Sequence, residues 1–273
     1  MKAVSQERKY LIGDVARIAG LSRDALRFYE KKGIISSSKM DNGYRCYSDL
    51  DIYRLMHILY YRKMNISLGD LEELMSGRAE PVASTRESIA RQIEEEKAEL
   101  KRHQWAITRL QMVQRDMERI ERFTNRCTIK SFPSAYILES CGSFQEGLEK
   151  WFDLSSAVEA LDMTYFYTVL QFCGGKAVNR GTELLLYSEL ADKLGEDFPF
   201  ESCPRTRQQK CIYQVVKSEH MIPEKEQLEK MLQWGRERGL KPGETVYVNV
   251  MTCFFKGRKI IYGLELYMPL KGE

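Results

Sequence analysis

The chain has 273 residues, with 42 Lys and Arg against 39 Asp and Glu, and its composition is 43% hydrophobic and 30% charged. This length suits two domains, and the composition is that of a folded soluble protein rather than a disordered one. No apolar run reaches the ~18 residues that a membrane span needs, and the first 20 residues lack the apolar stretch of a signal peptide. We therefore expect a cytoplasmic protein that does not contact a membrane.

Charge is distributed unevenly along the chain. Residues 1–63 hold 13 Lys and Arg against 7 Asp and Glu, whereas residues 124–273 hold 19 against 20. If a polyanion binds this protein, it should meet the first quarter of the chain. A chance surplus on a solvated face is the alternative that charge alone leaves open.

The first pattern along the chain is a pair of short helices. Apolar residues recur from Ile12 to Ala19 at the spacing of one helix face, and Gly20 suits a C-cap. Ser22 suits the N-cap of a second helix, which ends at Gly33. Two short helices joined by a tight, glycine-containing turn are typical of a helix-turn-helix.

Residues 36–49 break the helical pattern. Asn42 and Gly43 suit a turn with positive φ, and Tyr44 and Tyr47 supply strand formers beside it, so we predict a small hairpin, or wing. Ser48 then caps a helix to about residue 63. Ser67, followed three residues later by an Asp, starts another, and this first module ends near residue 77.

Basic and aromatic side chains gather on the second helix. Arg23 and Arg27 are four residues apart and share one face, and Lys31 follows one turn later. Phe28 and Tyr29 are able to lie along a sugar-phosphate backbone, where a Tyr hydroxyl donates to phosphate. Tyr29 fits a core position equally well, but the arginines do not.

A long charged segment without Pro or Gly covers residues 84–123. Apolar residues recur in it every seven positions in one row, Ile93, Leu100 and Ile107, and a second, offset row of Ile89, Leu110 and Met117 is interrupted by Glu96 and His103. Such a narrow seam predicts a coiled coil with a second copy of the helix, in a homodimer. Packing of the helix against the chain's own C-terminal domain is the alternative.

After Cys127 the pattern becomes rich in strands. We predict a strand over residues 128–140 with an irregularity at Pro133, and further strands over 163–172, 182–190 and 209–218. We also predict helices over 144–161 and 223–239, and a final hairpin that turns at residues 256–257. No strand is followed by a Gly-rich loop and a helix, so a nucleotide-binding fold is not indicated. The sequence predicts an α+β domain with an antiparallel sheet.

The final two strands place different chemistry on their two faces. Leu264 and Leu266 share an aliphatic face, while Glu265 and Tyr267 share the opposite face, to which Tyr247 also belongs. An unpaired buried carboxylate is costly, so Glu265 either points to water or awaits a cation, which the aromatic rings would favour. A Glu265 on the outer side of the sheet is the alternative.

The run Y-L-I-G-D-V-A-R-I-A-G-L-S-R-D-A-L-R-F-Y-E-K-K-G-I-I and the later D-N-G-Y-R-C-Y-S resemble the N-terminal domain of the MerR family of bacterial transcription regulators. The resemblance covers about residues 10–77 in order, spacing and wing. It implies that Arg27 and Tyr29 match the family's recognition helix, Tyr44 and Arg45 its wing, and Arg62 a phosphate contact.

The chain departs from that pattern at two positions. Phe28 stands where relatives usually have Tyr, which removes one phosphate donor, and Cys46 stands where they have an aromatic or aliphatic residue. The predicted DNA contacts are Ser22, Arg23, Arg27, Phe28, Tyr29, Gly43, Tyr44, Arg45 and Arg62.

The C-terminal part is similar to the GyrI-like effector domain of Bmr-type, multidrug-responsive members of that family. The residues that carry this resemblance are G-L-K-P-G-E-T-V-Y-V at 239–248 and G-L-E-L-Y at 263–267. It implies that Glu265 is the acid of a ligand pocket and Tyr247 a pocket tyrosine. The predicted ligand-binding residues are Glu265, Tyr247, Tyr165, Tyr167, Trp151, Tyr187 and Tyr267.

Metal- and redox-sensing members resemble one another in having paired cysteines after the dimerisation helix. Here Cys127 and Cys141 are 14 positions apart without a third ligand nearby, a weak site, and none of the seven cysteines forms a C-x-x-C pair. We therefore predict no metal ligand and no cofactor. A metal or thiol-redox sensor of the same family is the alternative.

Three domains are predicted: a winged helix-turn-helix at 1–77, a long coiled-coil dimerisation helix at 78–126, and a GyrI-like α+β ligand-binding domain at 127–273. The resemblance implies a homodimer that binds double-stranded promoter DNA and senses hydrophobic, cationic small molecules. Ligand binding would let it distort the DNA so that RNA polymerase can use the same promoter.

An enzyme is the rival class, because some GyrI-like domains resemble small-molecule hydrolases. Glu265 with Tyr247 would then activate a water molecule. The C-terminal part has only one histidine, His220, and no nucleophile–base pair is evident. We predict no catalytic residue.

Overall fold

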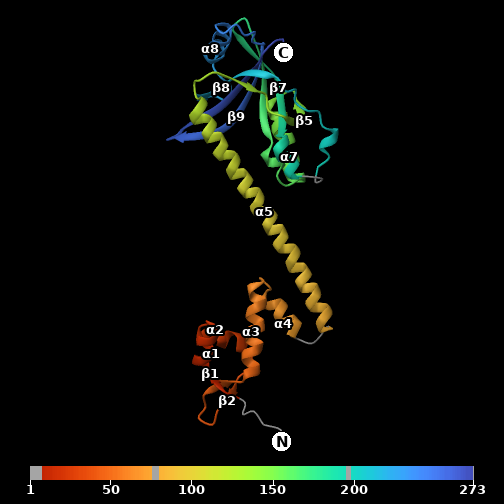
Figure 1. The fold of residues 1–273 in the computed structure, drawn as a ribbon, viewed down its shortest axis with the longest axis vertical. Helices are drawn as coiled ribbons and strands as arrows, with labels where there is room; N and C mark the ends of the chain where they lie inside the picture. Colours follow the sequence, from red (N-terminus) through yellow and green to blue (C-terminus); the bar gives the residue numbers. More distant parts are fainter. Residues whose placement is uncertain (1–7, 76–79, 195–197, 273) are drawn as a thin grey trace. The chain divides into compact units, whose positions relative to one another are not determined.

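The computed structural model describes residues 8–75, 80–194 and 198–272 (Figure 1). The chain divides into two compact units, residues 1–103 and 104–273. The domain boundary predicted between residues 77 and 78 lies outside the described residues. The two units are described in turn.

The first unit begins with the two predicted helices. Helix α1 (Ile12–Ala19) ends at Gly20, whose left-handed φ of 66° a side chain would disfavour. Helix α2 (Arg23–Lys31) begins at Ser22, whose Oγ accepts a hydrogen bond from Ala25 N at 3.0 Å. The helix-turn-helix prediction is confirmed. It could be made from the sequence because local capping residues set the end of α1 and the start of α2.

A small antiparallel sheet follows, with strand order β1–β3–β2. Its strands are β1 (Tyr10–Leu11), β2 (Ser38–Lys39) and β3 (Arg45–Tyr47). The hairpin β2–β3 is the predicted wing; it turns at Gly43, which has a φ of 81°. Strand β1 was not predicted, because two residues are too few to show a period.

Two helices complete this unit. Helix α3 (Asp49–Lys63) has the predicted cap at Ser48, reinforced into a capping box by Asp51. Helix α4 (Leu68–Met75) starts where Asp70 N donates to Ser67 Oγ at 3.1 Å. Their apolar faces close over one core whose buried members are Val15, Leu26, Ile34, Ile35, Tyr47, Leu55, Ile58, Ile66 and Leu71.

Helix α5 spans Pro81–Phe123, as one uninterrupted helix. Of its predicted apolar rows, Ile89 packs in the first unit and Met117 in the second. The exposed apolar residues along the helix are Val82, Ile93, Leu100, Ile107, Leu110 and Val113. Within the described residues no helix is long and apolar enough to cross a membrane.

The second unit is built on a seven-stranded antiparallel sheet with the order β4–β8–β10–β9–β6–β7–β5. Its strands are β4 (Thr128–Ser131), β5 (Ala135–Cys141), β6 (Tyr165–Cys173), β7 (Lys176–Tyr187), β8 (Lys210–Ser218), β9 (Thr245–Lys256) and β10 (Lys259–Pro269). The antiparallel α+β prediction is confirmed. The irregularity predicted at Pro133 in the strand over 128–140 is a complete break: the two halves are separate strands, β4 and β5, at opposite edges of the sheet.

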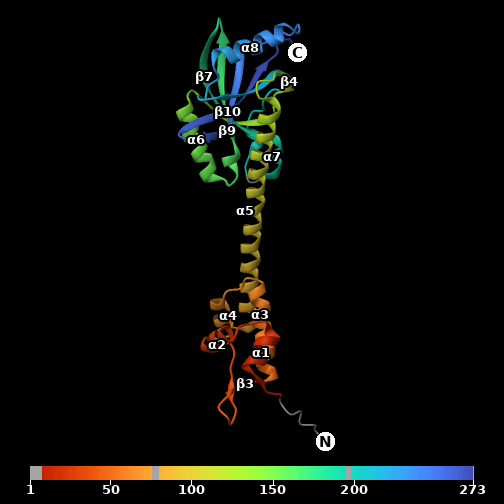
Figure 2. The ribbon, with the colours of Figure 1, turned by 90° about the vertical axis from the view of Figure 1, so that its left-hand side faces the viewer.

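Short helices cover parts of the sheet (Figure 2). They are α6 (Phe144–Ala157), α7 (Ser188–Leu194) and α8 (Lys225–Arg236), with 3-10 turns at Leu161–Met163 and Phe200–Ser202. The strand predicted over 182–190 is wrong at its end, since β7 stops at Tyr187 and α7 begins at the next residue. Its first residue, Ser188, donates a backbone hydrogen bond to the Ser134 carbonyl oxygen, and the two side-chain hydroxyls are also hydrogen-bonded.

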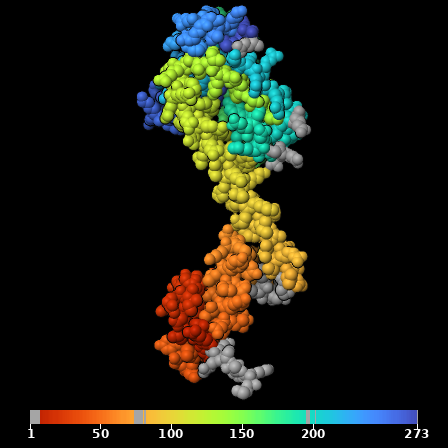
Figure 3. Space-filling model, in the orientation of Figure 1, coloured from red at the N-terminus to blue at the C-terminus, as the bar shows by residue number. Residues whose placement is uncertain are grey.

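The two faces of the sheet carry different side chains, as the sequence indicated. One face is aliphatic and packs against α8 through Leu228 and Met231. The other is aromatic and packs against Ile120 in the last turns of α5. Figure 3 shows this end of α5, in yellow-green, in contact with the rest of the second unit. Glu265 belongs to the aromatic face.

Candidate DNA-binding surface and candidate ligand cavity

Helix α2 turns its charged face away from the core of the first unit. Leu26 is buried, while Arg23 and Arg27 are exposed. Arg27 Nη1 donates to Asp24 Oδ1 at 3.2 Å, in an exposed ion pair that costs little to exchange for a phosphate. Both arginines are therefore free to reach an external anion.

The aromatic residues of α2 divide between surface and core. Phe28 is 44% exposed and meets the Tyr29 ring edge-on, with the centroids 6.1 Å apart. Tyr29 is half-buried against the core of this unit. Tyr29 thus packs against the core, which the sequence allowed as an alternative to DNA contact, while part of the side chain stays accessible.

A carboxylate that the sequence did not single out joins α2 to the wing. Glu30 accepts a hydrogen bond from Arg45 Nη1 at 2.5 Å through one oxygen, and from Tyr47 OH at 2.9 Å through the other. Burial and the contact with Glu30 raise the pKa of Tyr47, which keeps its proton available for this bond. Glu30 fixes the wing relative to α2.

The tip of the wing is exposed. Tyr44 is 65% exposed, and its backbone N–H donates to Asn42 Oδ1 at 3.2 Å, which shapes the turn around Gly43. Cys46 is buried, with its Sγ 3.0 Å from Ser38 Oγ, so the small side chain serves the packing of the wing. Arg62, at the end of α3, donates through Nη1 to the Ile66 carbonyl oxygen at 2.6 Å.

In the second unit Glu265 is completely buried, so its placement on the outer side of the sheet is excluded. Its Oε1 accepts from Tyr167 OH at 3.0 Å, Asn249 Nδ2 at 3.0 Å and Tyr187 OH at 3.4 Å. Its Oε2 accepts from Tyr213 OH at 3.2 Å and from Arg119 Nη1 at 3.0 Å. A buried carboxylate with donors on both oxygens avoids the cost of an unpaired charge.

Strand register brings these groups together. Glu265 on β10 pairs with Asn249 on β9, which pairs with Tyr167 on β6, so the three form one row across the aromatic face. Burial, followed by the charge of Glu265, raises the pKa of Tyr167 and Tyr187. These hydroxyls therefore stay protonated and able to donate.

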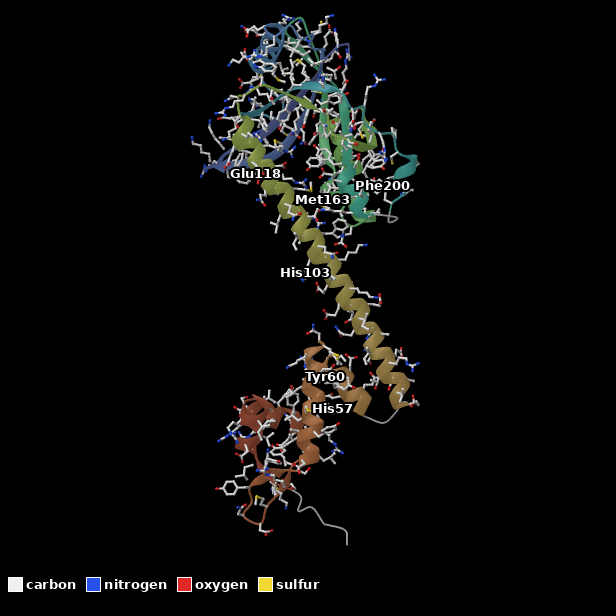
Figure 4. The ribbon with its side chains drawn as sticks, in the orientation of Figure 1. His57, Tyr60, His103, Glu118, Met163 and Phe200 are labelled. Atoms are coloured by element: carbon white, nitrogen blue, oxygen red, sulfur yellow. The ribbon has the colours of Figure 1, made fainter. Side chains whose placement is uncertain are left out.

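A cavity of about 420 Å³ opens beside this cluster, a size that suits a small organic molecule. The predicted residues Tyr165, Tyr187 and Tyr267 line it, and the first two rings stack with centroids 4.2 Å apart. Glu118, labelled in Figure 4, lines it from α5. Other lining residues are Arg115, Arg119, Arg122, Phe123, Lys130, Ser131, Pro133, Ser134, Ser188 and Glu189.

Four predicted ligand residues are not among those that line the cavity; one of them is Glu265, which lies buried beside it. Tyr167 lies beneath it, bonded to Glu265, and is completely buried. Tyr247 packs on Phe132, with ring centroids 4.6 Å apart. Trp151 is on α6, where its neighbours are Phe152 and Phe166. The structure therefore gathers Tyr165, Tyr167, Tyr187 and Tyr267 around Glu265 and leaves Trp151 apart.

The cluster also holds charged residues that the sequence did not indicate. Arg119 and Asp116, both on α5, form an ion pair, and Arg119 continues to Glu265. Lys130 places its Nζ 4.4 Å from the Tyr213 ring centroid. Burial lowers the pKa of Lys130, which Glu265 offsets only in part. The spacing of Asp116 and Arg119 on one helix face was the only local signal.

Cysteine and histidine do not converge on a site. Among the described residues, no group of three His, Cys, Asp or Glu side chains is placed to hold a metal ion. Cys127 and Cys141 are unpaired, the first half-buried and the second buried.

The first unit is a winged helix-turn-helix: two short helices, a hairpin wing joined to the second by Glu30, and arginines exposed on both. Comparison with known proteins shows to which family of winged helix-turn-helix proteins the chain belongs. The model of the MerR HTH family regulatory proteins matches residues 10–78. The chain belongs to the MerR family and is a DNA-binding transcription regulator.

Curated relatives agree with that assignment. The transcriptional regulator CueR of Escherichia coli O157:H7 is 33% identical over 93 residues, which cover 34% of this chain and 68% of CueR. The transcriptional regulator ZntR of Escherichia coli K12 is 29% identical over 143 residues, covering 51% of this chain and 97% of ZntR. A cryo-EM structure of an EcmrR–DNA complex aligns with 97% of this chain and all of that one, at 13% identity and a TM-score of 0.35.

Proposed function

We propose that the protein is a homodimeric, ligand-responsive regulator that binds double-stranded promoter DNA and senses lipophilic, cationic small molecules. The observation that carries the proposal is the buried Glu265, surrounded by tyrosines beside a cavity, in the same chain as a winged helix-turn-helix. Such a site has no evident role in DNA binding. It has the features of a small-molecule site, since a cavity lined by tyrosine rings and by charged side chains opens beside a buried carboxylate.

The class of ligand follows from the same groups. Tyrosine rings attract cations through their electron-rich faces, and a buried carboxylate adds a full negative charge. The proposal is supported by Arg119, which places a guanidinium, itself a cation, on Glu265. The tyrosine rings that line part of the cavity favour a hydrophobic body around the charged group.

The DNA side of the proposal uses the residues exposed on α2 and the wing. Arg23 and Arg27 would enter the major groove, while Tyr44 and Arg45 would contact the neighbouring backbone. Dimerisation through the exposed row on α5 would present two such units to two half-sites. Distortion of the promoter in the ligand-bound state would then allow RNA polymerase, a partner at the same promoter, to start transcription.

The test is an in vitro transcription assay with lipophilic cations and neutral aromatic molecules, using wild type and Glu265→Gln. We expect cations to change transcription by the wild type, and Glu265→Gln to lose that response while still binding the promoter. Equal responses from both proteins would remove the carboxylate from the mechanism. Recovered ligand is analysed in parallel, because chemical turnover would instead support a hydrolase, and a response to metal ions alone would support a metal sensor.

A further inference from the structure

Glu265 does not wait for a cation in this structure, because Arg119 already occupies that place. Arg119 Nη1 lies 3.0 Å from Glu265 Oε2, and its other terminal nitrogen pairs with Asp116. The Arg119 side chain is only 17% exposed. Burial alone would lower the pKa of Arg119, but attraction by Glu265 outweighs it and the pKa is raised, so the guanidinium stays charged.

The position of Arg119 allows its side chain to move away from Glu265. It lines the cavity, so a molecule that enters there can contact its side chain. Its Nε is buried and has no hydrogen-bond partner among the described residues, which makes its present position an imperfect one. Asp116, three residues earlier on the same helix, remains as an anionic partner if Arg119 moves away from Glu265.

The other charges near the site do not replace Arg119. Arg115 pairs with Glu189, with Nη1 3.1 Å from Oε2, at the rim of the cavity. Lys130 sits over the rings of Tyr213 and Tyr267. Among the described residues, Arg119 is the cation within ion-pair distance of Glu265.

We propose that Arg119 is an internal counter-ion of the ligand site, which a cationic ligand must displace from Glu265 in order to bind. This inference rests on the proposed function. It makes Arg119 a specificity-determining residue: a neutral ligand gains nothing at Glu265, and a weakly bound cation cannot compete with a guanidinium held by two carboxylates. Because Arg119 belongs to α5, the exchange also breaks the ion pair that joins this helix to β10.

The test measures binding of tetraphenylphosphonium, a lipophilic cation, by titration calorimetry. Arg119→Gln should bind it at least about tenfold more tightly than wild type, a gain of ~1.4 kcal/mol. Arg236→Gln is the matched control: it removes the same charge from the same unit, but at an exposed position on α8, which packs on the aliphatic face of the sheet, so its affinity should change less than about threefold. Adding Glu265→Gln to Arg119→Gln should abolish the gain.

Two further measurements keep the test decisive. Triphenylphosphine oxide, a neutral analogue, should bind wild type and Arg119→Gln equally; a gain for it would show only a widened cavity. Should Arg119→Gln not fold, Asp116→Asn with Arg119→Gln removes one charge of each sign, and it should still gain affinity for the cation.

The outcomes separate the two proposals. Equal cation affinity in wild type and Arg119→Gln would overturn the counter-ion while leaving the cation site intact. No cation binding by either protein would overturn the cationic ligand class itself. Binding by Arg119→Gln alone would support the counter-ion in its strongest form.

Discussion

Asp116 is a residue whose surroundings predict a measurable pH dependence. Burial raises its pKa from 3.8 to about 6, although Arg119 opposes this. Between these values the folded protein retains a proton that the unfolded chain has lost. The free energy of unfolding should therefore fall as the pH rises from about 4 to 6, by roughly 3 kcal/mol from this group.

Urea denaturation of wild type and Asp116→Asn at several pH values tests this sign. Asp116→Asn cannot lose the proton, so its free energy of unfolding should decline less across this window than that of wild type. Asp153→Asn, at an exposed position in the same unit, is the control and should follow wild type. A wild-type decline that Asp116→Asn shares in full would show that another group is responsible.

Arg27 is the residue on which the DNA proposal depends most directly. It is exposed on α2, where it forms an exposed ion pair with Asp24. Arg27→Ala should weaken operator binding by roughly tenfold and reduce the slope of log affinity against log salt by about 1, because one phosphate contact is lost. Arg258→Ala, in the turn of the β9–β10 hairpin, should alter neither quantity. An unchanged salt slope for Arg27→Ala would mean that α2 is not the recognition helix.

At the scale of elements, the seam of α5 carries the dimer prediction. Leu100 is 58% exposed in the single chain, and Ile93 and Ile107, seven residues away on each side, are also exposed. Leu100→Glu should raise the dimer dissociation constant by roughly 100-fold, or ~2.7 kcal/mol, because two carboxylates would be buried in the seam. Ala98→Glu adds the same charge on the opposite side of the helix and serves as the control. Sedimentation velocity that shows equal dimer in both variants would contradict the seam.

Local signals predicted the elements whose ends are fixed by neighbouring residues. Ser22 and Ser48 cap their helices with their own hydroxyls, and Gly43 supplies the positive φ of the wing. The end of β7 was misjudged because an apolar run fits a strand and a buried helix alike. Ser188, which is hydrogen-bonded to the sequence-distant Ser134, is instead the first residue of a helix.

The candidate site shows the same division. Alternation along β10 correctly separated Glu265 from the aliphatic face, because a strand's two faces follow from its period of two. The partner of Glu265 could not be found this way, since Arg119 is 146 residues distant and only tertiary packing brings it near. Tyr213 and Asn249 depend likewise on strand order, which no local pattern encodes.

At the scale of the whole molecule, the two compact units predict two separable responses to binding. A ligand at 100 times its dissociation constant stabilises the unit that holds its site by ~2.7 kcal/mol, which for about 170 residues raises Tm by roughly 5–10 °C. In scanning calorimetry, a lipophilic cation should shift the transition of residues 104–273, and operator DNA that of residues 1–103. Glu265→Gln should abolish the first shift alone, and Arg27→Ala should diminish the second alone.

Coupling between the two sites sets the size of any cross effect. If the ligand changes operator affinity by some factor, the operator must change ligand affinity by the same factor, and such coupling is typically ~1–3 kcal/mol. Adding the cation to the operator-bound protein should therefore move both transitions, with the larger shift in the second unit. A cation that raised the Tm of the first unit more than that of the second would place its site outside the cavity beside Glu265. Strict independence of the two transitions would leave the protein able to bind both molecules but unable to use one to control the other.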